Sequence, residues 1–402
     1  MGLFAFGGKR QHIMANAIPI GLLFSRSGPY WAPGQQGYFG ALAAIEAVNA
    51  SGEYPFELVA HDADPEGKTD RYAGLCRDMI KRTGLRHVVG CTTSWSRKEV
   101  IPVVEKADAL LWYPCVYEGF EASENVVYIA ASPNQHLLPL LDYIVPRFGR
   151  NAFLTGSNYI WGWEMNRIAR EVLHHSGGSV LGERYVPIGD VEIHHIVAEI
   201  KAKKPDFILN NLIGPSSYAF LKAYHELGLA DPAFAPGVRP VLSCNLYEGE
   251  ASLLGNAIAG HYTVSCYFQS LSGQANRAFL RQVAGKQGTE QVTAFFVEAY
   301  SSVLLIANAM RQAGTDAIAE VLAAAKVHPF SAPFGESIVD ARTNHVLMPA
   351  HIGRARADGD FDVVFEAGGA IEPDPFLTRS RLGIPGGEAM PPAKAPHLRV
   401  VQ

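Results

Sequence analysis

Hydroxyl side chains gather at one point of the chain, where residues 90 to 98 read GCTTSWSRK directly after the apolar Val89. A strand that only had to turn would be served by glycine, proline or asparagine. The Ser94 hydroxyl and the free backbone N–H groups at the start of the following helix can instead donate hydrogen bonds to a ligand oxygen. The residue types therefore predict a binding site at this strand end, with Ser94 as a ligand-binding residue.

Two further segments combine polar and aromatic residues, YPCVYEG at 113–119 and GSNYIWG at 156–162. Their tyrosine hydroxyls and backbone carbonyls can accept hydrogen bonds from an amide NH2 group, while the aromatic rings cover a short alkyl group and limit its size. Nothing in this chemistry requires a charge, so a small neutral polar ligand is expected. The ligand-binding candidates in these segments are Tyr113, Cys115, Val116, Tyr159 and Trp161.

Catalytic and metal-binding patterns are absent from the sequence. It has no G-x-S-x-G turn, no H-E-x-x-H helix and no G-x-G-x-x-G after the first strand. The pairs His174-His175 and His194-His195 point about 100° apart on a helix, so neither pair can chelate one ion. Cys115 with a distant histidine could be a nucleophile, but nothing nearby nominates the base. We predict a protein that is not an enzyme, with no cofactor and no metal.

Composition sets the class of protein. A chain of 402 residues that is 48% hydrophobic and 18% charged can form two domains. The net charge of −5 and the scattered basic residues predict no direct contact with nucleic acid or an anionic membrane. No run of about 18 apolar residues is present to span a bilayer. Five cysteines without a C-x-x-C pair favour a reducing compartment.

The two ends of the chain are predicted to lie outside the folded part. In the N-terminal segment an apolar patch precedes Lys9 and Arg10, which is the reverse of a secretory signal, so the protein is expected to be cytoplasmic. Residues 1–17 are then an extension, with Met14 as an alternative start. Residues 377–402, rich in proline and glycine, form a flexible or extended tail.

Strands and helices alternate along the chain. Strands are predicted at 18–24, 56–61, 86–90, 109–113, 126–130, 151–156, 179–186, 206–210 and 240–244, and helices at 37–49, 69–83, 99–107, 137–148, 162–175, 216–227 and 294–310. This alternation is typical of parallel sheets covered by helices on both faces. Because ligands of such sheets lie outside the carboxyl ends of the strands, the three polar segments are expected to meet there.

The same segments carry a resemblance to a known family. VGCTTSWSRKEVIPVVEKADALLWYPCVYEGFE at 89–121, YIAASPNQHLLPL at 128–140 and GSNYIWGWE at 156–164 resemble type I periplasmic-binding-protein folds. Within that group they are similar to the cytoplasmic amide sensors that regulate aliphatic amidase operons by binding an antiterminator. Receptors of ABC transporters for urea and short-chain amides share much of the pattern. The resemblance extends over about 18–376.

The resemblance implies an α/β fold of two doubly wound parallel-sheet lobes, joined by three crossovers and closing on a ligand. The implied bounds are 18–133 plus 268–335 for the first lobe and 134–267 plus 336–376 for the second. The crossovers are placed near Ser132–Gln135, Tyr267–Ser270 and Ser331–Ser337. The strand-like 346–352 and 361–365 would complete the second lobe.

The resemblance also implies ligand contacts. Positions matching Ser94, Tyr113 and Tyr159 touch the amide in the sensor family. Three positions differ, because Thr92 and Trp161 stand where the sensor has tyrosine and Cys115 stands where it has threonine. Thr92 remains a ligand-binding candidate, because a threonine in place of the larger tyrosine opens that wall of the binding site. By position alone, Ile213, Gly214 and 245–247 face the cleft from the second lobe.

Two functional classes remain open. The first is a cytoplasmic amide sensor with an antiterminator partner. The second is the solute receptor of an ABC transporter, in the periplasm, for urea, short-chain amides or branched-chain amino acids. An amino-acid ligand would require an acid for its ammonium group, for which Glu248 and Glu118 are the candidates. A homodimer is a possible assembly, since homodimers are common in this fold.

Overall fold

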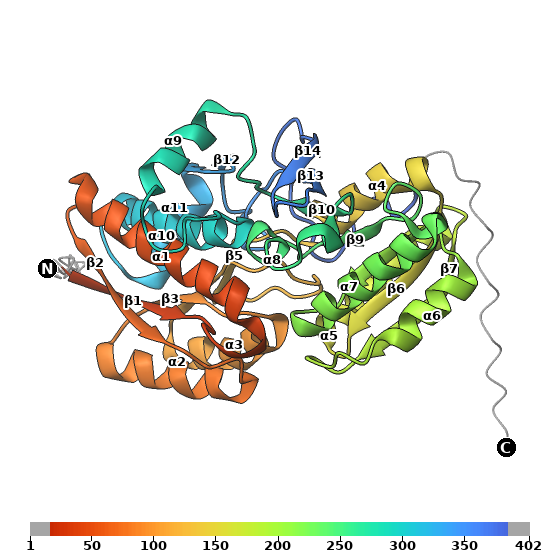
Figure 1. Ribbon diagram of the computed structural model, residues 1–402. Coiled ribbons are helices and arrows are strands. Elements are labelled where there is room, and N and C mark those ends of the chain that lie inside the picture. The colour runs from red at the N-terminus through yellow and green to blue at the C-terminus, as the bar shows by residue number, and fades with distance from the viewer. Residues whose placement is uncertain (1–16, 385–402) are drawn as a thin grey trace, which may run out of the picture.

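The computed structural model describes residues 17–384 and shows two lobes side by side, each built on one β-sheet (Figure 1). Most of the predicted N-terminal extension and the residues from 385 onward in the predicted tail lie outside this range. Within the described range, no helix is both long enough and apolar enough to span a membrane.

Lobe 1 is the five-stranded parallel sheet with its helices. Its strand order is β2-β1-β3-β4-β5, with β1 Ala17–Leu23, β2 Glu57–Ala63, β3 His87–Gly90, β4 Leu110–Tyr113 and β5 Val126–Tyr128. Strands β3, β4 and β5 are buried along their whole length, which explains their continuous apolar sequence. The covering helices are α1 Trp31–Ser51, α2 Thr69–Thr83, α3 Ser94–Ala107, α9 Gln274–Val283, α10 Ala294–Ala313 and α11 Ile318–Val327.

Lobe 2 is the seven-stranded sheet with its helices. Its strand order is β14-β13-β10-β9-β8-β6-β7, with β6 Asn151–Ser157, β7 Ser179–Val186, β8 Phe207–Asn211, β9 Val241–Ser243, β10 Tyr262–Ser265, β13 His351–Ala355 and β14 Phe361–Phe365. Strands β6 to β10 run parallel, and the late strands β13 and β14 are added antiparallel at one edge. The helices are α4 Leu137–Phe148, α5 Ile160–His175, α6 His194–Lys203, α7 Pro215–Ala230 and the short α8 Glu248–Ala251.

The predicted fold class is confirmed, since both lobes are doubly wound. The structure differs from the prediction at the start of α3, which begins at Ser94 and runs through Pro102 instead of starting at Glu99. Pro102 lacks the N–H that would bond to the carbonyl of Lys98. Both residues are exposed, so water can bond to that carbonyl and the helix continues.

The third crossing between the lobes lies later in the chain than predicted. The segment Ser331–Ser337 forms most of a hairpin, β11 Phe330–Ala332 and β12 Gly335–Ser337, that packs on the lobe 1 core. Met348 still belongs to that core, whereas Ala350 belongs to the core of lobe 2. The crossing therefore falls between Met348 and Ala350, because apolar residues after the hairpin remain anchored to lobe 1. The other lobe bounds stay a prediction.

Candidate ligand-binding site

A cavity of about 50 Å³ lies between the lobes. Its walls come from the loops and the first turns of the helices that follow β1, β3 and β4 in lobe 1 and β6, β8 and β9 in lobe 2, with one residue from α10. The lining residues are Tyr30, Pro33, Thr92, Thr93, Ser94, Cys115, Val116, Tyr159, Trp161, Ile213, Asn245, Tyr247, Glu250 and Phe295. The cavity is thus at the carboxyl ends of the parallel strands, next to the points where each sheet reverses its winding direction.

The loop after β3 presents its hydroxyls from a strained backbone. Cys91 has φ 74° and Thr93 has φ 116°, values that are rare for residues other than glycine. The Cys91 N–H donates to the carbonyl oxygen of Leu23 at 2.9 Å, which ties the loop to β1. Such backbone conformations persist only where the surrounding structure fixes them, and they concentrate at functional sites. With this backbone conformation, Thr92, Thr93 and Ser94 line the cavity.

The Ser94 hydroxyl is part of a buried charged network. It donates a hydrogen bond to Glu118, and Glu118 also accepts one from the fully buried Arg97 at 3.0 Å. Arg97 also donates to Glu121 at 2.7 Å. Burial opposes the charge of Arg97, but Glu118, Tyr113 and Glu121 outweigh it and raise its pKa well above the usual range. Ser94 therefore faces the cavity with its lone pairs, since its proton is committed to Glu118.

Glu121 completes this network on the exposed side. Burial raises the pKa of its carboxyl, but Arg97 and Lys98 lower it further, to about 2. The Lys98 ammonium donates to Glu121 at 2.7 Å. The network holds the start of α3 and the loop after β4 in one arrangement, which fixes the lobe 1 wall.

Three polar atoms in the wall are buried without a hydrogen-bond partner among the described residues. They are Thr92 Oγ1, Trp161 Nε1 and the Tyr247 hydroxyl oxygen. A buried polar atom without a partner costs about 1–3 kcal/mol, so proteins rarely retain one without a function. The indole N–H of Trp161 can only donate, so an acceptor atom of a ligand could bond to it. The three atoms come from both lobes, so one small molecule could bond to the two lobes together.

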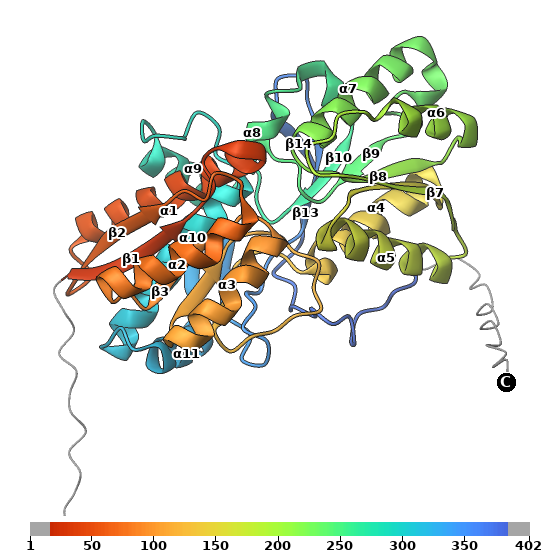
Figure 2. The same cartoon turned by 90° about the horizontal axis from the view of Figure 1, so that it is seen from below.

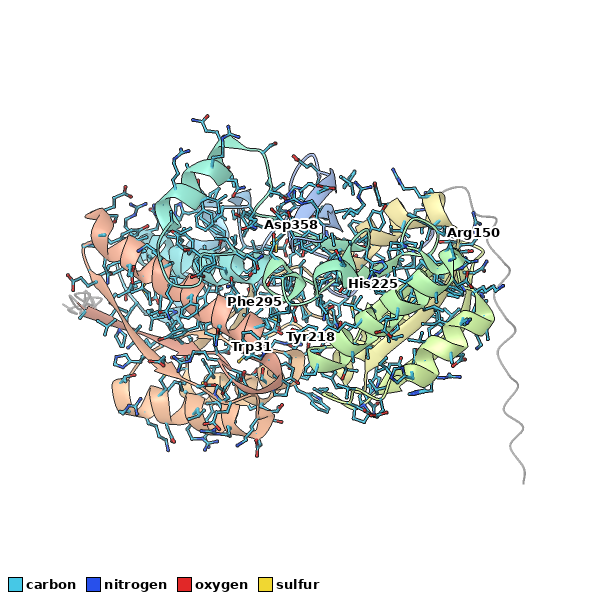
Figure 3. All side chains as sticks on the ribbon, in the orientation of Figure 1. Trp31, Arg150, Tyr218, His225, Phe295 and Asp358 are labelled. Atoms are coloured by element: carbon cyan, nitrogen blue, oxygen red, sulfur yellow. The ribbon has the colours of Figure 1, made fainter. Side chains whose placement is uncertain are left out.

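The acid at the cavity is Glu250, which the sequence analysis missed. Its carboxylate accepts a hydrogen bond from the Tyr218 hydroxyl at 2.6 Å. Burial raises the pKa of Glu250 to about 7, although the Tyr218 hydrogen bond lowers it. Trp31, Tyr218 and Phe295 mark this region between the lobes in Figure 3. Glu250 is therefore close to half protonated at neutral pH.

Neither acid proposed from the sequence lines the cavity. Glu118 is bonded to Arg97 and Ser94. Glu248 is buried beside the second crossing, where it accepts a hydrogen bond from the Gln269 N–H at 3.0 Å. Burial raises the pKa of Glu248 to about 8.

Most residues predicted for the site line this cavity. These are Thr92, Ser94, Cys115, Val116, Tyr159, Trp161 and Ile213. Tyr113 does not, because its ring lies in the core between the sheet and helices α2 and α3, with the Arg97 guanidinium 4.7 Å from the ring centroid. Gly214 does not line it either. Burial raises the pKa of the Cys115 thiol to about 12, which leaves almost no thiolate for nucleophilic attack.

Several wall residues had no signal, or only a weak one, in the sequence. Tyr30 and Pro33 follow β1, so the rule that ligands lie at strand ends could have found them. Phe295 comes from α10, which is distant in the chain, and its sequence context is that of a core helix.

Comparison with solved structures shows the same fold in solute-binding proteins. An ABC transporter solute-binding protein from Rhodopseudomonas palustris HaA2, solved with p-hydroxybenzoic acid, is 20% identical with a TM-score of 0.80, over 91% of this chain and 100% of that chain. The branched-chain amino acid substrate-binding protein LivJ from Streptococcus pneumoniae, solved with isoleucine, is 19% identical with a TM-score of 0.72, over 89% and 100%. At these identities the likeness concerns the fold alone.

A curated relative matches a shorter stretch. The protein named limonene hydroxylase from Geobacillus stearothermophilus is 28% identical over 123 residues, which is 30% of this chain and 22% of that protein. The chain therefore covers less than a quarter of that relative.

The family model described as periplasmic binding protein domain matches residues 18–381, nearly the whole described structure. The chain belongs to the periplasmic binding protein domain family.

Proposed function

We propose that this protein is a receptor for a small neutral polar solute, such as urea or a short aliphatic amide, held in the interlobe cavity. The observation that carries the proposal is the set of unpartnered polar atoms on Thr92, Trp161 and Tyr247. No basic side chain is present among the described residues that line the cavity, so a carboxylate ligand would have no cationic partner there. A neutral ligand needs none.

The size of the cavity supports the same ligand class. A volume of about 50 Å³ is small but exceeds the space that one water molecule needs, about 10–15 Å³. Urea and acetamide are among the smallest polar solutes and suit such a cavity. Their carbonyl oxygen can accept from Trp161 Nε1 and the Tyr247 hydroxyl, and their N–H groups can donate to Ser94 Oγ and Thr92 Oγ1.

The cellular role we propose is that of a solute receptor of an ABC transporter, which would act in the periplasm. The matched structures are themselves described as solute-binding proteins of transporters, which favours this role over regulation of an amidase operon. The antiterminator partner and the homodimer have support only from the sequence resemblance, and the cytoplasmic location has support from that resemblance, the N-terminal segment and the cysteines.

A second candidate ligand class is a branched-chain amino acid. Glu250 favours it, because an ionised carboxylate at the wall could pair with a ligand ammonium group. The free N–H groups at the start of α3 could bind the ligand carboxylate. This candidate requires Glu250 to be ionised, and its pKa of about 7 makes that dependent on pH.

Thermal unfolding with a ligand panel tests the proposal. The panel comprises urea, acetamide, propionamide, leucine, valine and 4-hydroxybenzoate, each measured at pH 6 and pH 8.5. A ligand at a hundred times its Kd stabilises the protein by about 2.7 kcal/mol. We expect urea or an amide to stabilise the protein at both pH values. Stabilisation by leucine or valine alone, stronger at pH 8.5 and lost in Glu250→Gln, would establish the second candidate instead.

A further inference from the structure

Gly214 brings the backbones of the two lobes into direct contact. It follows β8 in lobe 2 and precedes the first residue of α7, with φ 54°. A Cβ atom at this position would lie 2.6 Å from the carbonyl oxygen of Pro29. Pro29 belongs to lobe 1, in the short 3-10 helix Gly28–Tyr30 after β1. Because the obstructing atom is in the backbone, no side-chain rotation could relieve the clash.

Two other contacts cross between the lobes around the cavity. The rings of Trp95 from α3 and Tyr159 at the start of α5 meet edge to face, with centroids 5.5 Å apart. On another side α8 packs against α1 (Figure 2), where a Cβ on Gly249 would lie 3.9 Å from Cγ of Gln36. The lobes are therefore in contact around the cavity, with the backbone of Gly214 close to that of Pro29.

We infer that Gly214 is a positioning residue, whose missing side chain permits the lobes to close and thereby sets ligand affinity without touching the ligand. The claim about ligand affinity rests on the proposed function, whereas the claim about closure does not. Unpartnered atoms on Thr92 in lobe 1 and on Trp161 and Tyr247 in lobe 2 can bond to one small molecule only when the lobes are together. Since apparent affinity falls with the fraction of molecules in the competent state, a side chain that separates the lobes weakens binding.

Glycine could alternatively be required only for its backbone conformation. Gly189 separates the two explanations, because it also has a positive φ, 86°, and lies in lobe 2. A Cβ on Gly189 would meet no atom within 4 Å. Gly189→Ala therefore carries the cost of an unfavourable φ without an obstruction between the lobes, and it is the control for Gly214→Ala.

Closure is measured without a ligand by disulfide formation across the contact between the lobes. The reporter is the pair Gln36→Cys and Gly249→Cys, since a Cβ at Gly249 would lie 3.9 Å from Cγ of Gln36, so the two cysteine side chains are within reach of each other. Oxidised glutathione is the oxidant, and a gel mobility shift gives the rate. We expect Gly189→Ala to keep the rate of the parent and Gly214→Ala to slow it at least tenfold.

Equal rates in the parent and both alanine variants would overturn the inference. Circular dichroism first establishes that Gly214→Ala is folded; an unfolded variant would also overturn the inference, because a residue that only permits closure should leave each lobe folded. Adding urea or acetamide should accelerate cross-linking in the parent and much less in Gly214→Ala. If neither compound accelerates it while Gly214→Ala still slows it, the closure inference holds and the proposed ligand class is wrong.

Discussion

Replacement of Thr92 by valine should stabilise the protein without ligand and weaken ligand binding. Thr92 is 2% exposed and its Oγ1 has no hydrogen-bond partner among the described residues. The nearby Tyr72 hydroxyl bonds to the Ser25 hydroxyl at 2.7 Å and to the Thr92 carbonyl oxygen at 3.3 Å. Valine keeps the shape of threonine and removes only the unpaired polar atom.

The magnitude follows from the cost of an unpaired buried group. Removing it should raise the free energy of unfolding by about 1 kcal/mol, the lower end of that cost. Loss of one hydrogen bond to the ligand should weaken binding about tenfold, or about 1.4 kcal/mol. At a ligand concentration that is a hundred times the parent's Kd, the stabilisation by ligand should fall from about 2.7 to about 1.4 kcal/mol.

Thermal unfolding of Thr92→Val with and without urea or acetamide measures both effects. The matched control is Thr155→Val, because Thr155 is equally buried but bonds to Asn210 Oδ1 at 3.1 Å and does not line the cavity. The control should lose about 1 kcal/mol of stability and keep the full ligand effect. The reasoning is refuted if Thr92→Val loses as much stability as the control, or if its response to ligand equals that of the parent.

Three further perturbations test the electrostatics of the described residues. Arg97→Met should lower stability by about 3–5 kcal/mol in thermal unfolding, because it leaves Glu118 and Glu121 without their buried partner, and a loss below about 1 kcal/mol would contradict the network. Burial raises the folded-state pKa of Glu248 to about 8, so this group makes stability fall as pH rises from about 4.5 to 8; Glu248→Gln should make the fall less steep by removing that contribution, and an unchanged pH profile would argue against a buried proton. Cys115 should react with iodoacetamide at pH 8 at least a hundredfold more slowly than free cysteine, because its pKa is about 12, and rapid alkylation would show a thiolate.

The sequence predicts the order of elements well where local patterns are strong. The helix at 69–83 was placed correctly because an apolar stripe precedes Gly84, which ends it in a left-handed conformation. The third crossing was misplaced because the segment from Phe330 to Met348 is held by contacts with distant parts of lobe 1. Non-local packing of that kind leaves no periodic trace in the segment itself.

The residues of the candidate site could likewise be predicted where the local sequence decides their position, but not where strand pairing or helix orientation does. Residues such as Thr92 and Trp161 could be predicted, because they directly follow parallel strands whose ends converge. The position of Tyr113 could not, since it is the last residue of β4 and only the pairing of that strand decides which face its ring takes. Glu250 was missed in favour of Glu248, because helix α8 turns only one of two nearby carboxylates toward the cavity.

The assembly of lobe 1 from distant stretches of chain determines what a nascent chain exposes during translation. Helix α10 packs closely on α1, with Gly40 against the backbone of Phe296. Strands β1 to β5 leave the ribosome long before α10 does, whereas the parallel strands β6 to β10 emerge as one continuous stretch. The apolar face that α10 covers therefore stays exposed through most of synthesis, and exposed apolar surface of this kind favours aggregation of an incomplete chain.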